Sequence, residues 1–205
     1  TSTVTPSSPV LTDSEHGPIT PSMAQLAIDG ERFATMGDPA APVTIVEFSD
    51  YGCLFCRLYT LTTFPEIKTK YIDTGQVYYV HKDLPVVSLR GDLAAQAAEC
   101  AGQQDRYWDM HTKLFIEPAE WDGTIAQALE SFRRYAAALE LDAARLEQCV
   151  AEGDYAATVE RNVSEAQALR LNGTPVFFIN QKLLIGAQSI EAFHPILDAE
   201  LAAQP

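Results

Sequence analysis

The sequence predicts an α/β fold in which a block of helices is inserted into one sheet. Short β-branched and apolar runs, typical of buried strands, occur at 43–49, 76–81, 175–179 and 182–185. Between the second and third of these strands, at about 89–171, Ala, Leu, Glu and Gln dominate and apolar residues recur at helical spacing. Strands on both sides of a helical block indicate a single sheet with an insertion, not two tandem domains.

The composition is that of an ordinary globular protein. Of the 205 residues, 47% are hydrophobic and 20% are charged, which is enough for one substantial domain. The formal net charge of −14 disfavours binding to nucleic acid, whose phosphates need Lys and Arg, and we attribute the acidity to solubility. No run of 18 or more apolar residues occurs, so no membrane-spanning segment is predicted.

The N-terminal segment is rich in Ser, Thr and Pro and shows no periodicity. We therefore expect residues 1–32 to form a flexible tail or linker ahead of a domain at 33–205. The chain has no signal peptide and does not begin with Met, which fits a mature form that has lost a leader or a membrane anchor.

A helix is predicted directly after the first strand. Leu54, Leu58 and Leu61 lie at helical spacing, and Pro65 kinks or ends this helix. A turn signal at 73–75 then marks the entry to the second strand.

Turn-forming residues divide the insertion into four or so helices. The breaks fall near 117–118, 121–123, 140–142 and 152–154. Asp154 is expected to cap the last of these helices, and the Asn-Gly pair at 172–173 to end it. After the insertion, Asn180-Gln181 forms a tight hairpin connection between the last two strands, and residues 189–201 form a closing helix with one apolar face.

Two cysteines follow the first strand. Cys53 and Cys56 are three positions apart at the start of the predicted helix, a spacing that can close and reopen a small disulfide ring. The helix N-terminus carries partial positive charge and free N–H groups, which favour a thiolate on the first cysteine. Because a thiolate is the species that attacks disulfides, the spacing predicts a redox centre. The alternatives are a structural disulfide that never cycles and half of a zinc site.

Three more residues are candidates. Glu47 lies in the apolar strand, six residues before Cys53. An ionised carboxylate beneath a sheet is costly, so burial favours its protonated form and would let it move protons for Cys56; the alternative is a side chain that reaches solvent. Cys100 and Cys149 lie on predicted helices of the insertion, either as a disulfide or as two buried thiols. The four histidines have no metal-ligand spacing, and no metal site is predicted.

With this order of elements the chain resembles the thioredoxin fold and, within it, the DsbA-type thiol–disulfide oxidoreductases. The resemblance runs from about Phe33 to the C-terminus. It rests on the cysteine pair after a strand, on Glu47, on Thr174-Pro175 opening a strand, and on the helical insertion.

The resemblance implies roles for these residues. Cys53 would be the nucleophile and Cys56 the resolving thiol. Pro175 would follow a cis peptide bond and face the disulfide. Thr174 would present backbone N–H and C=O groups to an extended substrate peptide.

Leu54 and Phe55, between the cysteines, depart from the family pattern. The first position is often Pro, and the best-known oxidant of the family has His at the second, which helps to hold the thiolate. We assign Leu54 and Phe55 to substrate binding. Since they cannot donate a hydrogen bond, we expect the helix N-terminus and backbone N–H groups to do most of the stabilising of the Cys53 thiolate. Some relatives have a second disulfide within the insertion, which implies a Cys100–Cys149 bridge.

The resemblance implies thiol–disulfide exchange on secreted or cell-envelope proteins, outside the cytoplasm in a bacterial periplasm or cell envelope. The expected reaction is oxidation of substrate dithiols by a Cys53–Cys56 disulfide. The alternatives are a reductase or isomerase, and a non-catalytic binding or chaperone module with a structural cysteine pair. No organic cofactor or metal is needed. The expected partners are reduced secreted proteins and a membrane redox partner of the DsbB or vitamin K epoxide reductase type, and the expected state is a monomer.

Overall fold

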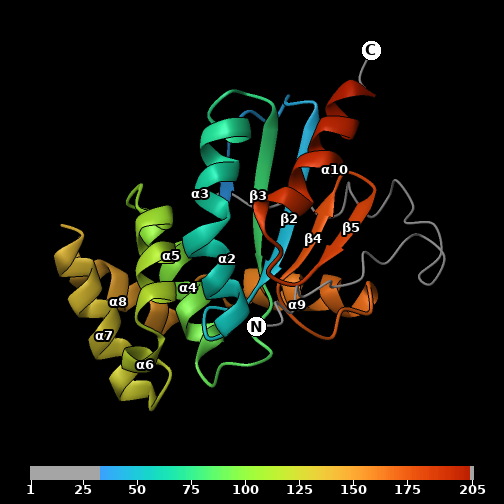
Figure 1. Cartoon of the computed structure of the whole chain (residues 1–205). Coiled ribbons are helices and arrows are strands. Elements are labelled where there is room, and N and C mark those ends of the chain that lie inside the picture. Colours follow the sequence, from blue (N-terminus) through green and yellow to red (C-terminus); the bar gives the residue numbers. More distant parts are fainter. Residues whose placement is uncertain (1–32, 204–205) are drawn as a thin grey trace, which may run out of the picture.

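The computed structural model describes residues 33–203, which contain a mixed five-stranded sheet in the order β1-β3-β2-β4-β5 (Figure 1). The strands are β1 (Thr35–Met36), β2 (Val43–Ser49), β3 (Val77–Asp83), β4 (Val176–Ile179) and β5 (Lys182–Ile185). Among the described strands only β2 and β3 are parallel; the other neighbours pair antiparallel. The predicted α/β fold, with helices inserted between the second and third predicted strands, is confirmed. The tail predicted at 1–32 lies outside the described residues.

Helices cover both faces of the sheet (Figure 1). One face carries α2 (Leu54–Thr62), α3 (Phe64–Ile67) and α10 (Ile190–Ala202), and the other carries α9 (Ala156–Ala168). Side chains alternate along β2, so Ile45 belongs to the same core as Tyr59 and Phe193, whereas Val46 packs with Ala166. Glu47 is two positions from Ile45 and therefore points to the α2 and α10 side.

Pro65 divides the segment after β2, as predicted. Helix α2 ends at Thr62, and a new helix, α3, begins with Pro65 in its first turn. Proline is tolerated there because N–H groups in the first turn of a helix have no hydrogen-bond partner within the helix. This helix continues into the π-helical turn η1 (Lys68–Ile72) before β3 begins.

The insertion contains six helices in the described chain, more than the four or so predicted. Beside α9 these are α4 (Gly91–Gly102), α5 (Tyr107–Ile116), α6 (Pro118–Trp121), α7 (Ile125–Ala138) and α8 (Ala143–Glu152). All four predicted breaks are present. The missed break separates α4 from α5, where Asp105 takes a positive φ of 60° without the help of Gly or Pro.

Two predicted helix boundaries in the insertion are wrong. The N-cap of α9 is Tyr155, and Asp154 instead donates its backbone N–H to the Cys149 carbonyl oxygen at 3.2 Å, which closes the end of α8. Helix α9 ends before the predicted stop at 172–173, because Arg170 already takes a left-handed φ of 58° there.

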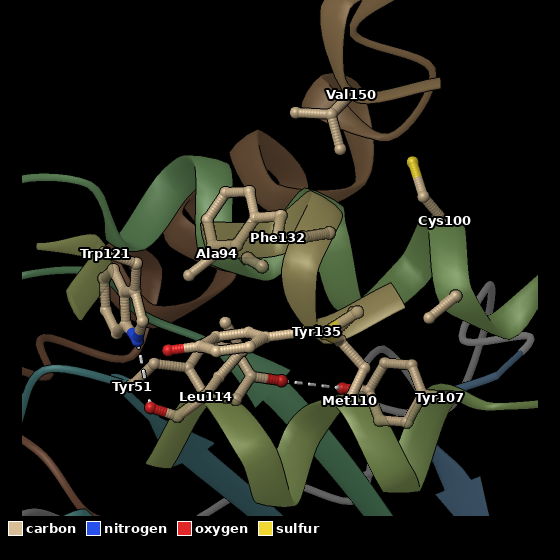
Figure 2. Close-up of a cluster of buried hydrophobic side chains, with 14 of the residues drawn as sticks. Tyr51, Ala94, Cys100, Tyr107, Met110, Leu114, Trp121, Phe132, Tyr135 and Val150 are labelled. Atoms are coloured by element: carbon tan, nitrogen blue, oxygen red, sulfur yellow. Dashed lines mark hydrogen bonds between the residues drawn. The ribbon is translucent and has the colours of Figure 1, made fainter. Parts of the chain in front are cut away.

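The insertion has its own apolar core (Figure 2). Trp121 is fully buried in it and donates its indole N–H to the Leu114 carbonyl oxygen at 3.0 Å. Tyr51, from the loop between β2 and α2, reaches into this core, and its hydroxyl lies 3.5 Å from that of Tyr107. The same core includes Cys53 and Cys56, so the insertion packs directly against the cysteine pair.

The C-terminal part follows the prediction closely. Strands β4 and β5 form a hairpin whose turn is Asn180-Gln181, and Asn180 also accepts a hydrogen bond from the Thr44 N–H at 2.9 Å. Helix α10 begins after Ser189, its N-cap. None of the helices in the described range is long and apolar enough to cross a membrane.

Candidate active site

Cys53 and Cys56 occupy unequal positions at the start of α2. Cys53 is the N-cap residue of the helix, and Cys56 lies within its first turn. Both are free thiols; 6% of Cys53 is exposed, whereas Cys56 has no exposed surface. The exposed surface of the pair therefore belongs to Cys53 alone.

The pKa of Cys53 is lowered from 9.0 to about 5, so this thiol is ionised at neutral pH. The largest cause is a hydrogen bond from the Cys56 side chain, which outweighs the opposing effect of burial. Thr174 and the backbone N–H groups of Cys56 and Phe55 add smaller contributions. The hydrogen bond from Cys56 thus adds to the backbone N–H groups at the helix start, which the sequence analysis expects to do most of the stabilising, because the reduced pair can share the one remaining thiol proton.

Cys56 behaves in the opposite way. Burial raises its pKa far above the ordinary value, and the hydrogen bond to Cys53 and the charge of Glu47 raise the pKa further. Cys56 therefore keeps its proton at neutral pH. The reduced pair consists of one thiolate, at Cys53, and one fully buried thiol, at Cys56.

The segment at the start of β4 lies against the pair. The peptide bond between Thr174 and Pro175 is cis, and the Cys53 sulfur lies 3.5 Å from the Thr174 carbonyl oxygen.

Glu47 is buried beneath α2, with an exposed fraction of 1%. The hydroxyl of Tyr79 donates to Glu47 Oε2 at 2.5 Å, and Nδ1 of His81 lies 3.4 Å from the same oxygen. Oε1 of Glu47 has no hydrogen-bond partner in the described part of the chain. The alternative that Glu47 reaches solvent is therefore excluded.

His81 extends this buried polar cluster, and sequence reasoning gave it no role. Its Nε2 lies 3.4 Å from Asp83 Oδ1, so the imidazole stands between two carboxylates. Burial by itself lowers the pKa of His81, but the contacts with Asp83 and Glu47 outweigh burial and raise the pKa to about 10. Alternation along β3 could have placed His81 and Asp83 on one face, but only the strand register sets His81 opposite Glu47.

Apolar side chains surround the cysteine pair on the surface. Leu54 and Phe55 are 70% and 60% exposed, and Leu58 continues the stripe along α2. Leu58 also lines an open hollow of about 250 Å³ between α2 and residues 187–191. These residues offer an apolar contact area beside the Cys53 sulfur.

A second apolar segment is held near the pair by Asp50, which the sequence analysis missed. The buried Asp50 carboxylate accepts hydrogen bonds from the N–H groups of Gly52, Val87 and Ser88 at 2.6–3.1 Å. It thereby ties the loop after β3, with the exposed Val87 and Leu89, to the loop that carries Cys53.

The two other cysteines form a disulfide. Cys100 of α4 and Cys149 of α8 are joined with an S–S distance of 1.95 Å and a Cα–Cα distance of 6.0 Å. No group of three or more His, Cys, Asp or Glu residues within 33–203 is arranged to hold a metal ion, so the zinc reading of Cys53 and Cys56 finds no further ligands there.

Unequal thiols at a helix start, above a buried carboxylate on a sheet with a helical insertion, are typical of DsbA-type thiol–disulfide oxidoreductases, and the chain is of this class. Residues 30–199 match the family described as Thioredoxin, so the chain belongs to the thioredoxin family.

Solved structures show the same fold. The α-DsbA1 of Wolbachia pipientis is 26% identical, with a TM-score of 0.77 over 87% of this chain and 95% of that one. BdbD of Bacillus subtilis is 25% identical, with a TM-score of 0.75 over 83% of this chain and 93% of that one.

Curated relatives fall into two groups. Disulfide bond formation protein D of Bacillus subtilis is 26% identical over 174 residues, which cover 81% of this chain and 76% of the relative. Na(+)/H(+) antiporter NhaA 3 of Salinispora tropica is 31% identical over 167 residues, which cover 80% of this chain but only 24% of the antiporter. The chain thus spans about a quarter of the length of such antiporters.

Proposed function

We propose that the protein oxidises the dithiols of secreted or cell-envelope proteins through a Cys53–Cys56 disulfide. The observation that carries this proposal is the pair of free cysteines at the start of α2, where Cys53 is the N-cap residue and its pKa is lowered to about 5. A sulfur that is stable as a thiolate at neutral pH is a good leaving group, and its stability favours the reduced form of the pair. The disulfide form is then the reactive one and acts as an oxidant.

Two exchange steps complete the reaction. A substrate thiolate first attacks the Cys53 sulfur, the Cys53–Cys56 bond breaks, and Cys56 leaves as a thiolate. Because its pKa is strongly raised, Cys56 takes up a proton, for which we assign Glu47 as the donor. A second substrate thiolate then attacks the substrate sulfur of the mixed disulfide, and Cys53 leaves as a thiolate. Two electrons pass from the substrate dithiol to the cysteine pair.

Substrate binding is assigned to the surface around Cys53. Thr174 and Pro175 would pair with an extended peptide through backbone groups, and Leu54 and Phe55 would contact its apolar side chains. The proximity of the Thr174 carbonyl oxygen to the Cys53 sulfur and the exposure of Leu54 and Phe55 support this assignment.

An extracytoplasmic home, in a bacterial periplasm or cell envelope, fits the Cys100–Cys149 disulfide, because such bonds persist in oxidising compartments. There, a membrane partner of the DsbB or vitamin K epoxide reductase type would reoxidise the pair. The name of the Bacillus relative, Disulfide bond formation protein D, supports the oxidising direction. We propose that the protein acts as a monomer.

A reductase or isomerase is the second candidate, favoured by Leu54 and Phe55 in place of the residues found in the best-known oxidant. The equilibrium between Cys53–Cys56 and glutathione separates the two functions. Reduction potentials run from about −270 mV for thioredoxin to about −120 mV for DsbA. We expect a value above about −200 mV; a lower value would identify a reductant.

A further inference from the structure

His81 is a fully buried imidazole that the exchange reaction described above does not use. It stands opposite Glu47 in the register of β2 and β3. Its two ring nitrogens each lie 3.4 Å from a carboxylate oxygen, Nδ1 from Glu47 and Nε2 from Asp83. An imidazole between two buried carboxylates is the arrangement expected of an imidazolium ion.

The remaining neighbours of His81 do not supply charge. Its ring lies 4.7 Å, centroid to centroid, from His111, whose pKa is lowered by burial and by the charge of His81, so that His111 is neutral. Tyr51 and Tyr107 also face His81, and burial raises the pKa of both, so they keep their protons.

The groups beyond this ring of neighbours are also accounted for. Tyr79, on the same strand, binds Glu47 and is neutral because burial raises its pKa. The charge of Glu99 on α4 helps to raise the pKa of Tyr51 and of Tyr107, and the charge of Glu47 helps to raise the pKa of Cys56 on α2. In the described chain the groups that meet the ring nitrogens of His81 are therefore the carboxylates of Glu47 and Asp83.

We propose that His81, held as an imidazolium between Glu47 and Asp83, is a positioning residue that fixes Glu47 Oε2 and leaves the second oxygen, Oε1, to exchange a proton with Cys56. The proposal rests on the function proposed for the cysteine pair. It assigns to His81 no proton transfer of its own.

The two oxygens of Glu47 have different hydrogen-bond partners. Oε2 accepts a hydrogen bond from the Tyr79 hydroxyl and faces His81, whereas Oε1 has no hydrogen-bond partner among the described residues. Glu47 is close enough to Cys56 for its charge to raise the pKa of that thiol. Glu47 therefore offers a proton leaving Cys56 an unoccupied oxygen, Oε1, on a carboxylate whose other oxygen is fixed. The hydroxyls of Ser49 and Thr174 also interact with Cys56 but are far weaker bases.

The charge of His81 offsets the cost of burying two carboxylates beside each other. In the reducing direction the proton moves from the Cys56 sulfur to Glu47 Oε1, and the Cys56 thiolate attacks the mixed disulfide. In the oxidising direction Glu47 Oε1 first takes up a proton from solvent, and that proton then passes to the Cys56 sulfur as the Cys53–Cys56 bond breaks. His81 keeps its proton in both directions.

The charge can be measured directly on the wild-type protein. Nitrogen-15 NMR of the reduced protein should show both ring nitrogens of His81 protonated at pH 7 to 8. A neutral His81 ring in that range would overturn the proposal. This measurement involves no substrate, so it stands whether or not the protein proves to be an oxidant.

The positioning role is tested by the rate at which Cys56 resolves a preformed mixed disulfide between Cys53 and thionitrobenzoate. In His81→Gln this rate should fall about tenfold at pH 7, and the acidic limb of its pH profile should move up by about one pH unit. His81→Lys, which retains a cation, should recover most of the rate. The matched control is His111→Gln, which removes a neutral buried imidazole from the same cluster and should leave the profile in place.

A double variant separates positioning from loss of packing. If His81 acts through Glu47, adding His81→Gln to Glu47→Gln should slow resolution no further. An additional tenfold loss in that background, or an unmoved profile in His81→Gln alone, would overturn the proposal. Should His81→Gln fail to fold, the NMR measurement on the wild type decides.

Discussion

The sulfur of Cys53 lies 3.5 Å from the carbonyl oxygen of Thr174, a residue 121 positions later in the chain. The contact joins the start of α2 to the start of β4, two places separated by the whole helical insertion. A peptide paired with the backbone at Thr174 would bring its own sulfur to Cys53.

Substitution of either cysteine should affect the reaction differently. Cys53→Ser should abolish oxidation of a reduced multi-disulfide substrate, because the accessible sulfur is lost. Cys56→Ser should instead accumulate mixed disulfides with substrate, because the resolving thiol is gone. Non-reducing gel electrophoresis with mass spectrometry identifies the trapped species. Wild-type oxidation rates in Cys53→Ser would disprove the assignment of the nucleophile.

The stability of the reduced protein should depend on pH through Cys53. Its pKa falls from 9.0 in the unfolded chain to about 5 in the folded protein, so folding stabilises the thiolate. This stabilisation is fully present above pH 9 and is lost as the pH falls through 5. The melting temperature of the reduced protein relative to the oxidised one should therefore rise between pH 5 and pH 9. Calorimetry at several pH values checks this.

Cys56→Ala is the control for that pH dependence. It removes the hydrogen bond that contributes most to the low pKa of Cys53. The pH midpoint for alkylation of Cys53 should then rise from about 5 toward the ordinary value. A midpoint that stays near 5 would assign the stabilisation to the backbone N–H groups instead.

The apolar residues between the cysteines should contribute to substrate affinity. Replacing both Leu54 and Phe55 with Ser should raise KM for an apolar peptide substrate about tenfold or more, since burying one large apolar side chain contributes about 1.5–3 kcal/mol. The reduction potential should change little. Ile125→Ser is a matched control, because Ile125 is 55% exposed and lies on α7 in the insertion. An equal change of KM in the control would show that the effect is not local.

Removing the second disulfide should destabilise the protein. Cys100 and Cys149 are 49 positions apart, and closing a loop of that length stabilises a fold by about 4 kcal/mol in the chain-entropy model. Replacing both with Ala should lower the melting temperature by about 8–16 °C, at about 2–4 °C per kcal/mol for a chain of this size. The potential of Cys53–Cys56 should stay nearly unchanged. A shift below about 3 °C would contradict the prediction.

Local patterns predicted most of the fold. The apolar runs that became β2, β4 and β5 and the proline after α2 carry their information within a few residues. Asp105 gave no such signal, because it adopts a conformation that glycine usually supplies, and so the break between α4 and α5 was missed.

The active site was only partly accessible to sequence reasoning. Cys53, Cys56 and Glu47 stand close together in the chain, and their spacing indicates their chemistry. The position of His81 opposite Glu47 depends on the register of β2 and β3, and the hydrogen bonds of Asp50 depend on a loop 37 positions later in the chain. Such contacts are decided by tertiary packing, which no local pattern records.

Cys56 shares its apolar surroundings with the helices of the insertion rather than with the sheet alone. One side of the surroundings of the Cys56 thiol is thus formed by the insertion, a segment that contributes no strand to the sheet within the described residues. Substitutions in the core of that segment, at positions such as Trp121 or Tyr107, would change how well water is excluded from the Cys56 thiol. The cysteine pair and the strand beneath it would be unaltered. Two relatives with identical redox motifs could then differ in oxidising power through their inserted helices alone.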